Sequence, residues 1–445
     1  MNKSRIHRSL NVWMNGLLVG IWSWDRADTH QFEYAESWIK STAARPLSLS
    51  LPVTAGLNVL RGMAVKNYFD NLLPDNKKIR QRISHRYQRS STTVPDLLEA
   101  VGRDCIGAVQ ILPPDVKPEG FDKITATRLT DSEIEKLLLN VTSDEDDSNI
   151  ISDFRISLAG AQEKTALLWH QGHWHVPHGT TPTTHILKLP LGLIGGMRAD
   201  MSGSIENEWL CMRIMAALGF EVAKADIAQF GTQKVLVVER FDRKWMGQEW
   251  IARLPQEDLC QASGVAPDNK YETDGGPGMA QCLHILEGSA NASKDKLNFV
   301  LMNLAFWLLA ATDGHAKNFS IALLAGGDYR LTPMYDILSA WPVIGRGANQ
   351  LQEKKIKMAM GLRSKNVHFK MSEMQVRHWQ VLAAQTGVVD CFAQMQRLVQ
   401  HVPDALAQVE RQLPMGFPGQ IWSSIRDGML RQQVRFLSEM TSQSE

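Results

Sequence analysis

The first part of the chain arranges apolar and polar residues in the pattern of a β-hairpin followed by short helices. Two apolar runs within residues 12–22 flank Asn15-Gly16, the residue pair that best fits a two-residue hairpin turn. Residues 47–51 alternate Leu and Ser, as a half-buried strand does. Three more elements are expected to complete a small α+β unit: a helix capped by Asp75, a helix capped by Asp96 and a strand at 107–112.

From residue 154 onward, the pattern predicts a sheet and then a set of helices. Apolar runs predict strands at 154–158, 165–169, 174–176, 185–189 and 234–241. A helix capped by Ser204 and spanning 205–218 interrupts these strands. Beyond residue 245 the apolar spacing becomes helical at 278–287, 294–311, 371–386, 391–402 and 420–438, with a strand-rich insertion at 319–335.

These patterns divide the chain into three parts of an α+β protein. Residues 1–148 form an N-terminal α+β subdomain with a linker that ends in the acidic run 143–148. Residues 149–245 form a strand-rich segment, and residues 246–445 form a part dominated by helices. A length of 445 residues suits two or three domains, which agrees with this division.

Composition changes this picture mainly by exclusion. With 44% apolar and 21% charged residues, the chain can bury a sizeable core and is not disordered. Lys and Arg number 48 against 47 Asp and Glu, so no overall charge draws the protein to nucleic acid or membrane. The five cysteines form no Cys-x-x-Cys pair, and the longest apolar run, 299–311, is too short to cross a bilayer. We therefore expect a cytoplasmic protein with no membrane partner and no disulfide framework.

The small-residue loop at 154–164 is the first candidate for chemistry, and it contains Ser157, Gly160 and Lys164. A P-loop would have a Gly before the Lys and a helix after it, whereas a strand is predicted here. Strand–loop–strand is the geometry of the kinase loop that covers nucleotide phosphates. An ordinary hairpin loop has the same pattern, so this segment alone leaves both interpretations open.

Lys188 lies on the next apolar strand, where a buried ammonium group requires a partner. In a kinase, the equivalent Lys binds the phosphates of ATP and is oriented by a Glu on the following helix. Glu208 is the candidate for that role, and Glu206 is the alternative. A Lys on the solvent face of an edge strand is the structural alternative.

The segment at 312–318 follows the long apolar helix and carries Asp313 and Asn318. Their separation by five positions matches a kinase catalytic loop, in which the Asp orients the substrate hydroxyl and the Asn binds Mg²⁺. Asp336, at the end of a later apolar strand, suits a second Mg²⁺ ligand. A helix-terminal turn would explain the first segment alone, but the order of loop, Lys, Glu, Asp, Asn and Asp is that of a kinase.

Two other groups of residues have plainer interpretations. Four histidines surround one predicted hairpin turn, but strand alternation does not make them converge as zinc ligands: His170, His173, His175 and His178. The basic segments 77–89 and 353–370 are candidates for contact with nucleic acid or an acidic partner, and a solvated face is the alternative for each.

The chain resembles the HipA-type serine/threonine kinase toxins of bacterial toxin–antitoxin modules. The resemblance lies in five stretches around the candidate residues and in two N-terminal ones: Phe154–Lys164, Thr181–Pro190, Val238–Arg243, Ala311–Ser320, Leu331–Ile337, Arg45–Pro52 and Tyr68–Asp75. It therefore covers nearly the whole chain. Thr-Asp-Gly and Tyr-Asp-Ile stand where ordinary protein kinases have His-Arg-Asp and Asp-Phe-Gly.

The resemblance implies a two-lobed, protein-kinase-like α+β fold with an added N-terminal subdomain. It implies that Asp313 is the catalytic base, that Asn318 and Asp336 bind Mg²⁺, and that Ser157 is an autophosphorylation site whose modification inactivates the enzyme. The residues implied to surround ATP are Ala159, Gly160, Ala161, Gln162, Glu163, Lys164, Lys188, Glu239, Arg240, Phe241, His315, Ala316, Lys317, Asn318, Tyr335 and Asp336.

The resemblance also implies partners for this kinase. The substrate would be glutamyl-tRNA synthetase, whose phosphorylation halts translation and promotes growth arrest and persistence. A HipB-like helix-turn-helix antitoxin dimer would bind the toxin and, with it, operator DNA. Two alternatives stay open, a nucleotide-binding scaffold or corepressor with vestigial catalysis and a small-molecule kinase.

Overall fold

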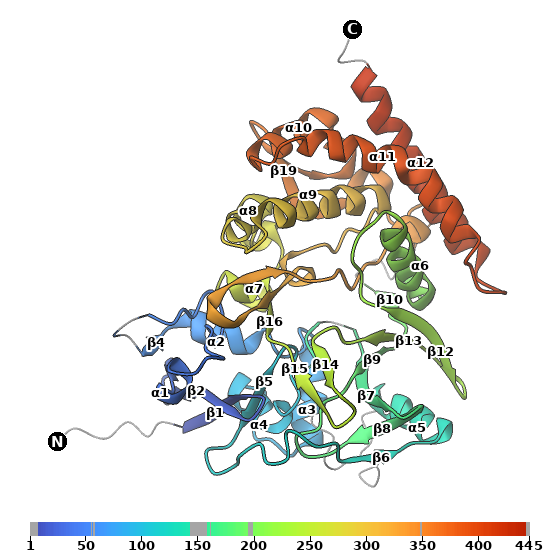
Figure 1. Cartoon of the computed structure of the whole chain (residues 1–445). Helices are drawn as coiled ribbons and strands as arrows, with labels where there is room; N and C mark the ends of the chain where they lie inside the picture. The colour runs from blue at the N-terminus through green and yellow to red at the C-terminus, as the bar shows by residue number, and fades with distance from the viewer. Residues whose placement is uncertain are drawn as a thin grey trace. The chain divides into compact units, whose positions relative to one another are not determined.

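The structure of the chain is a computed structural model, and it describes residues 8–54, 56, 58–142, 158–160, 162–194, 199–347 and 349–441. The chain folds into two compact units, each assembled from separate segments (Figure 1). Unit 1 consists of Met1–Leu189, Ala228–Asn269 and Ser320–Tyr329, and unit 2 of Pro190–Ile227, Lys270–Phe319 and Arg330–Glu445. The division after residues 148 and 245 stays a prediction, and the acidic run 143–148 lies outside the described residues.

Unit 1 begins with a five-stranded antiparallel sheet in the order β4-β3-β2-β1-β5. Its strands are β1 (Arg8–Met14), β2 (Leu17–Trp24), β3 (His30–Tyr34), β4 (Val59–Arg61) and β5 (Val109–Leu112). Asn15 and Gly16 form the turn between β1 and β2 with φ values of 44° and 82°, the left-handed backbone that this turn requires. Trp22 stacks on Phe69 in the core at 3.9 Å between ring centroids. The predicted hairpin is confirmed.

Four helices accompany this sheet: α1 (Glu36–Ile39), α2 (Met63–Asp70), α3 (Lys77–Arg86) and α4 (Val94–Val101). The caps predicted at Asp75 and Asp96 are wrong. The side chain of Asn76 caps α3 by accepting from the backbone N of Lys78 at 2.9 Å, and Asp96 lies inside the first turn of α4. Pro95 explains the second error, because proline fits the first turn of a helix and lets the helix begin before it.

The strand predicted at 47–51 is also wrong, since only an isolated bridge joins Ser48 and Leu51. The hydroxyls of Ser48 and Ser50 donate to the backbone O of Gln261 at 3.2 and 2.7 Å. Serine side chains that bind backbone in this way compete with the regular ladder of a sheet.

A second, six-stranded sheet has the order β12-β13-β9-β7-β8-β6. Its strands are β6 (Ala126–Arg128), β7 (Lys164–His170), β8 (His173–Pro177), β9 (His185–Lys188), β12 (Ala225–Phe230) and β13 (Gln233–Glu239). Helix α5 (Asp131–Thr142) contributes Ile134 and Leu138 to a core that also contains Leu167 and Leu187. The strands predicted at 165–169, 174–176, 185–189 and 234–241 are confirmed, whereas residues 154–157 lie outside the described part.

Unit 1 also contains short elements that the sequence did not predict. They are the hairpin β14 (Arg243–Met246) and β15 (Trp250–Arg253), the strand β16 (Gln256–Asp258) and the helix α7 (Leu259–Ala262). Strands of three or four residues are too short to show alternation. In the predicted insertion, β17 (Ser320–Leu323) pairs with β16 and is followed by β18 (Tyr329–Leu331).

Unit 2 consists mainly of helices: α6 (Ser204–Ala217), α8 (Met279–Glu287), α9 (Ala292–Leu309), α10 (Val376–Gln385), α11 (Cys391–Glu410) and α12 (Gly419–Thr441). Two small strand pairs join them: β10 (Gly192–Ile194) with β11 (Ala199–Met201), and β19 (Lys357–Arg363) with β20 (Val367–Lys370). Trp307 of α9 packs against Trp379 of α10 and Phe436 of α12, at 6.2 and 6.4 Å between ring centroids. The buried side chains of α9 thus form part of the core of this unit.

Several helix ends differ from the predictions, and three of them have a local explanation or a separate turn. Ser204 is not a cap but the first residue of α6, and its hydroxyl accepts from the backbone N of Leu191 at 3.0 Å. Residues Met371–Glu373 form a separate 3₁₀ turn before α10. Helix α11 continues through Pro403, because a buried stripe that includes Val402 and Leu406 extends past the proline and outweighs its lost hydrogen bond.

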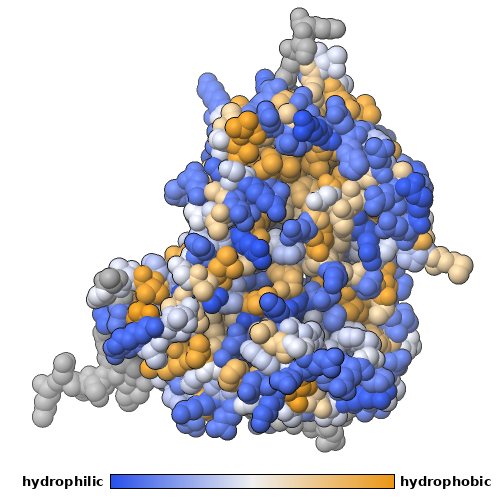
Figure 2. Space-filling view, in the orientation of Figure 1, coloured by the Kyte–Doolittle hydropathy of each residue, from blue (hydrophilic) through white to orange (hydrophobic). Residues whose placement is uncertain are grey.

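The face in Figure 2 and the cysteines suggest no further site. Figure 2 shows hydrophilic and hydrophobic residues interspersed over one face. All five cysteines are free and buried. Among the described helices, none combines the length and apolar character needed to span a bilayer.

Candidate active site

In unit 2, the loop after α9 places Asp313 and Asn318 on a rigid support. Helix α9 ends where Ala310 turns left-handed at φ 49°, and the 3₁₀ turn η3 (Ala316–Asn318) follows. Backbone bonds of 2.8 Å from His315 N to Asp313 O and of 2.9 Å from Asn318 N to His315 O fold the loop tightly. A Cβ on Gly314 would lie 2.4 Å from the ring of Phe306, so only glycine allows the loop to approach α9 this closely.

Asn318 and Asp336 meet, although they lie 18 positions apart in the sequence. Nδ2 of Asn318 donates to the backbone O of Asp336 at 3.3 Å and lies 3.5 Å from its carboxylate. Oδ1 of Asn318 is buried and has no hydrogen-bond partner among the described residues. The hydroxyl of Tyr335 donates to the backbone O of Lys317 at 2.9 Å and fastens the two segments together.

This pair fits a magnesium ion of the kind that kinases use. An orphaned buried amide oxygen beside a carboxylate supplies the oxygen ligands that Mg²⁺ prefers. Among the described residues, no group of three or more His, Cys, Asp or Glu side chains can hold a metal. Two protein ligands suffice for Mg²⁺ when phosphate and water oxygens supply the others.

Asp313 has neighbours that sequence reasoning missed in part. Its side chain is 61% exposed, and its Oδ1 lies 3.9 Å from Nε2 of the buried His315. Burial lowers the pKa of His315, so its imidazole is held neutral, and neither ring nitrogen has a hydrogen-bond partner among the described residues. The hydroxyl of Tyr271 donates to Oδ1 of Asp313. No sequence pattern pointed to Tyr271, which lies 42 positions before Asp313.

In unit 1, the structure brings together two lysines of the predicted ATP site. Lys164 on β7 and Lys188 on β9 are direct partners across the antiparallel ladder, so their side chains share one face of the sheet. Lys188 is 6% exposed.

The loop before β7 lies against the N-terminal part of unit 1. Nζ of Lys164 donates to the backbone O of Ala159 at 2.6 Å, and Gly160 adopts φ 105°. The backbone O of Gly160 accepts from the N of Asp75 at 3.0 Å, and Glu163 pairs with Arg82 of α3.

The same loop is also bonded just beyond the end of β9. Nε2 of Gln162 donates to the backbone O of Leu189 at 2.6 Å. Ser157 and Ala161 lie outside the described residues.

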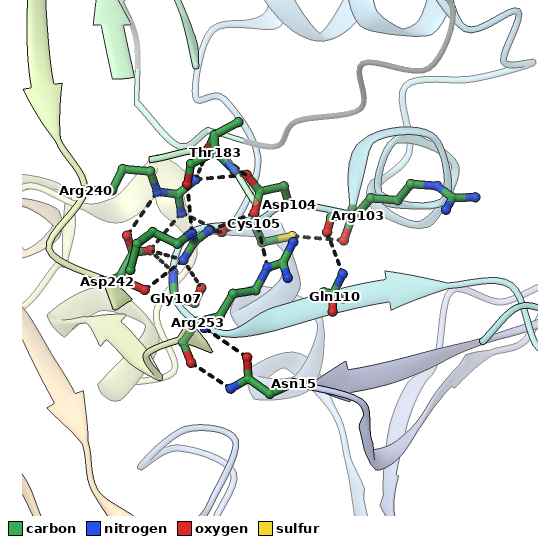
Figure 3. A network of polar contacts seen from close by, with 12 residues as sticks. Asn15, Arg103, Asp104, Cys105, Gly107, Gln110, Thr183, Arg240, Asp242 and Arg253 are labelled. Carbon is green, nitrogen blue, oxygen red and sulfur yellow. Dashed lines mark hydrogen bonds and ion pairs between the residues drawn. The ribbon is translucent and has the colours of Figure 1, made fainter. Parts of the chain in front are cut away.

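Of the predicted linker residues, Glu239 ends β13, and Arg240 and Phe241 follow it. The Arg240 side chain enters a buried polar network (Figure 3). The guanidinium of Arg240 lies 2.8 Å from Asp242 and 3.3 Å from Asp104. Burial alone would raise the pKa of Asp104, but three arginines outweigh it and hold that pKa well below its ordinary value: Arg243, Arg240 and Arg253. The Arg240 side chain is thus committed to this network, and sequence reasoning missed Asp104.

The remaining candidates fall into three sets. Glu206 and Glu208 are both buried in α6 of unit 2, and which of them pairs with Lys188 stays a prediction. Four arginines of the basic segment 77–89 already contact protein groups, namely Asp70, Glu163, the backbone O of Asn140 and Glu99. His170 and His175 lie 5.9 Å apart between ring centroids, and no described metal cluster includes them.

Comparison with known proteins places the chain in a family. A family model described as HipA-like C-terminal domain matches residues 156–412. A second, described as HipA N-terminal domain, matches residues 10–112. The chain belongs to the HipA family. The putative kinase Y4mE of Sinorhizobium fredii is 33% identical over 397 residues, which cover 86% of each chain. The serine/threonine-protein kinase toxin HipA of Shewanella oneidensis is 30% identical over 355 residues, 74% of this chain and 75% of that one.

A solved HipA structure confirms the fold. The Shewanella oneidensis HipA structure, a complex with HipB and operator DNA, matches with a TM-score of 0.79 over 97% of this chain and 98% of that one, at 24% identity. The predicted α+β, kinase-like fold of the HipA family is therefore confirmed.

Proposed function

We propose that this chain is a serine/threonine protein kinase that acts as the toxin of a toxin–antitoxin module. Membership of the HipA family supports the proposal, as does the printed name of the Shewanella relative, a serine/threonine-protein kinase toxin. The observation that carries it is the arrangement in unit 2. Asp313 has an exposed carboxylate, and Asn318, five positions later, donates to Asp336. The buried amide oxygen of Asn318 has no hydrogen-bond partner among the described residues and is available to a ligand.

In the proposed reaction, Asp313 orients a Ser or Thr hydroxyl and accepts its proton as the γ-phosphoryl group of ATP is transferred. Asn318 and Asp336 would hold Mg²⁺, which supplies charge neutralisation to the phosphates when bound. Lys164 and Lys188 would bind the phosphates. Positioning and charge stabilisation account for most of the rate enhancement in such a reaction.

The finer parts of the proposal concern regulation and partners. Ser157 would be an autophosphorylation site, and a phosphate there would add roughly −1.5 to −2 charge beside the triphosphate and inactivate the enzyme. The Shewanella structure contains HipB and operator DNA. A helix-turn-helix antitoxin dimer and its operator are accordingly the partners proposed for this chain, and glutamyl-tRNA synthetase is the proposed substrate.

Radiolabelled ATP tests the proposed activity. Purified protein, Mg²⁺ and [γ-³²P]ATP should label glutamyl-tRNA synthetase, and EDTA should abolish the label. If Mg²⁺-dependent ATP binding occurs without label on the synthetase or on any other protein of a bacterial lysate, the kinase proposal is contradicted in favour of a nucleotide-binding scaffold.

A further inference from the structure

Tyr271 of unit 2 contacts Asp313 in a way that the kinase reaction does not require. Its phenolic hydroxyl donates to Oδ1 of Asp313. Its ring meets that of His315 edge-on, with 5.0 Å between ring centroids and 79° between planes. Nζ of Lys270 also lies 5.5 Å from the centroid of the Tyr271 ring. The hydroxyl and the ring of Tyr271 thus both contact neighbouring side chains.

The residue after Tyr271 anchors this segment to β19. Oε2 of Glu272 accepts from the backbone N of Gly361 at 2.8 Å, and Oε1 accepts from Arg363 at 2.6 Å. The Glu272 side chain is 7% exposed. A Cβ on Gly278 would lie 2.4 Å from Cδ of Glu272, so the chain closes tightly over this carboxylate. The position of Tyr271 therefore follows from a buried anchor one residue away.

The hydroxyl of Tyr271 makes the hydrogen bond to Asp313 that a substrate hydroxyl would make in phosphoryl transfer. A catalytic Asp accepts a hydrogen bond from the acceptor hydroxyl before it takes the proton. Oδ1 of Asp313 already accepts such a bond from an O–H group of the protein itself. Hydrogen bonds to a charged acceptor are stronger than neutral ones, so an incoming hydroxyl must compete with this one.

We propose that Tyr271 blocks the acceptor position at Asp313 and that the substrate hydroxyl must displace it. The proposal rests on the kinase function proposed above and adds a regulatory contact to the same site. A blocked position lowers the apparent affinity for the acceptor in proportion to the fraction of molecules in which it is open. It leaves the chemical step unchanged once the acceptor is bound.

Tyr271→Phe tests the proposal, because phenylalanine retains the ring contact with His315 and loses only the hydroxyl. Initial rates are measured with glutamyl-tRNA synthetase as varied acceptor and with dephosphorylated casein as a second acceptor. We expect KM for the acceptor to fall about tenfold. The values of kcat and of KM for ATP should stay those of the wild type. A residue that merely supports the fold would instead lower kcat or the melting temperature.

Thr273→Val is the matched control, since it removes an exposed hydroxyl from the same segment, one that donates to Oδ1 of the neighbouring Asp274. It should leave all three parameters unchanged. If both the wild type and Tyr271→Phe label the acceptor and have equal KM for it, the blocking role of Tyr271 is overturned and the kinase proposal is not. Phosphate found on Tyr271 by mass spectrometry would also overturn it, because the residue would then be an acceptor. Absence of transfer by every variant would overturn the kinase proposal as well.

Discussion

At the scale of single residues, Asn318 uses the two ends of its amide differently. Its nitrogen is engaged by Asp336, and its buried oxygen has no partner among the described residues. A buried polar atom without a partner costs free energy, so its retention points to a ligand that completes it. The backbone of Asp336 is left-handed, with φ 60°, an uncommon conformation that often occurs at functional positions.

Asp336→Asn should weaken ATP binding in Mg²⁺ by at least about tenfold and leave binding in EDTA unchanged. Asparagine tolerates the left-handed backbone, so the variant removes charge without adding strain. Calorimetry with and without Mg²⁺ measures both affinities. Asp328→Asn, at an exposed position after β17, is the control. If Asp336→Asn bound Mg²⁺-ATP as tightly as the wild type, the metal site would lie elsewhere.

Spacing in the sequence pointed to Asp313 and Asn318, because a catalytic loop is a local motif with a fixed separation, and the end of an apolar strand pointed to Asp336. The structure adds the contact between Asn318 and Asp336, whereas their roles stay predictions. Tyr271 escaped prediction for a physical reason. It reaches Asp313 through folding of a distant segment, and a tyrosine in a loop carries no periodic signal.

At the scale of elements, a buried ionic network joins the two family domains inside unit 1. Asp104 lies in the segment matched by the HipA N-terminal domain, and its partners lie in that matched by the C-terminal domain. Arg243 approaches Asp104 to 2.8 Å, and Arg253 approaches it to 3.3 Å. All these side chains are at most 7% exposed. Such pairs are costly to break because the remaining charge stays buried.

Asp104→Asn should lower the free energy of unfolding by about 3–5 kcal/mol. The change leaves buried arginines without a compensating charge while retaining the size of the side chain. Urea unfolding followed by tryptophan fluorescence measures the loss. Glu36→Gln, which breaks an exposed pair with Lys40 in the same unit, should cost less than about 1 kcal/mol. Equal effects of the two changes would show that the network adds no stability.

The carboxyl group of Glu257 in β16 should make the stability of the fold depend on pH. Burial raises its pKa from the ordinary 4.5 to about 8, although Leu49 N donates to its Oε1 at 2.8 Å. Between these values the unfolded chain ionises while the folded carboxyl stays neutral, so this group lowers stability as pH rises from about 5 to 8.

Glu257→Gln removes that ionisation and keeps the shape of the side chain. The wild type should therefore lose more stability than the variant between pH 5 and pH 8, by roughly a few kcal/mol at most. Thermal unfolding at several pH values measures the difference between the two proteins. A difference that stays constant over this range would contradict the raised pKa of Glu257.

The elements themselves were predictable to different degrees. Long periodic segments such as α9 and the strands around Lys188 were found because their apolar spacing is unambiguous. Helix starts were displaced, as at Asn76, since several polar residues in a row can each serve as a cap. The short strands β14 to β16 were missed because three or four residues show no period.

At the scale of the whole molecule, the family resemblance extended further than any local pattern. The two matched segments, 10–112 and 156–412, contain both the lysines of unit 1 and the acidic residues of unit 2. The assembly of each unit from separate segments could not be predicted, because contacts between distant residues decide it. The fold class followed from the sequence, and the grouping of its segments required the structure.

The central claim is that Asp313 acts in phosphoryl transfer, and Asp313→Asn tests it most directly. The measurement is transfer of label from [γ-³²P]ATP to glutamyl-tRNA synthetase. The variant should transfer at least about a hundredfold more slowly than the wild type, since the acceptor proton loses its base. Its melting temperature should not change, and Asp404→Asn on the exposed surface of α11 should retain full activity. Transfer by a folded Asp313→Asn protein at the wild-type rate would contradict the account.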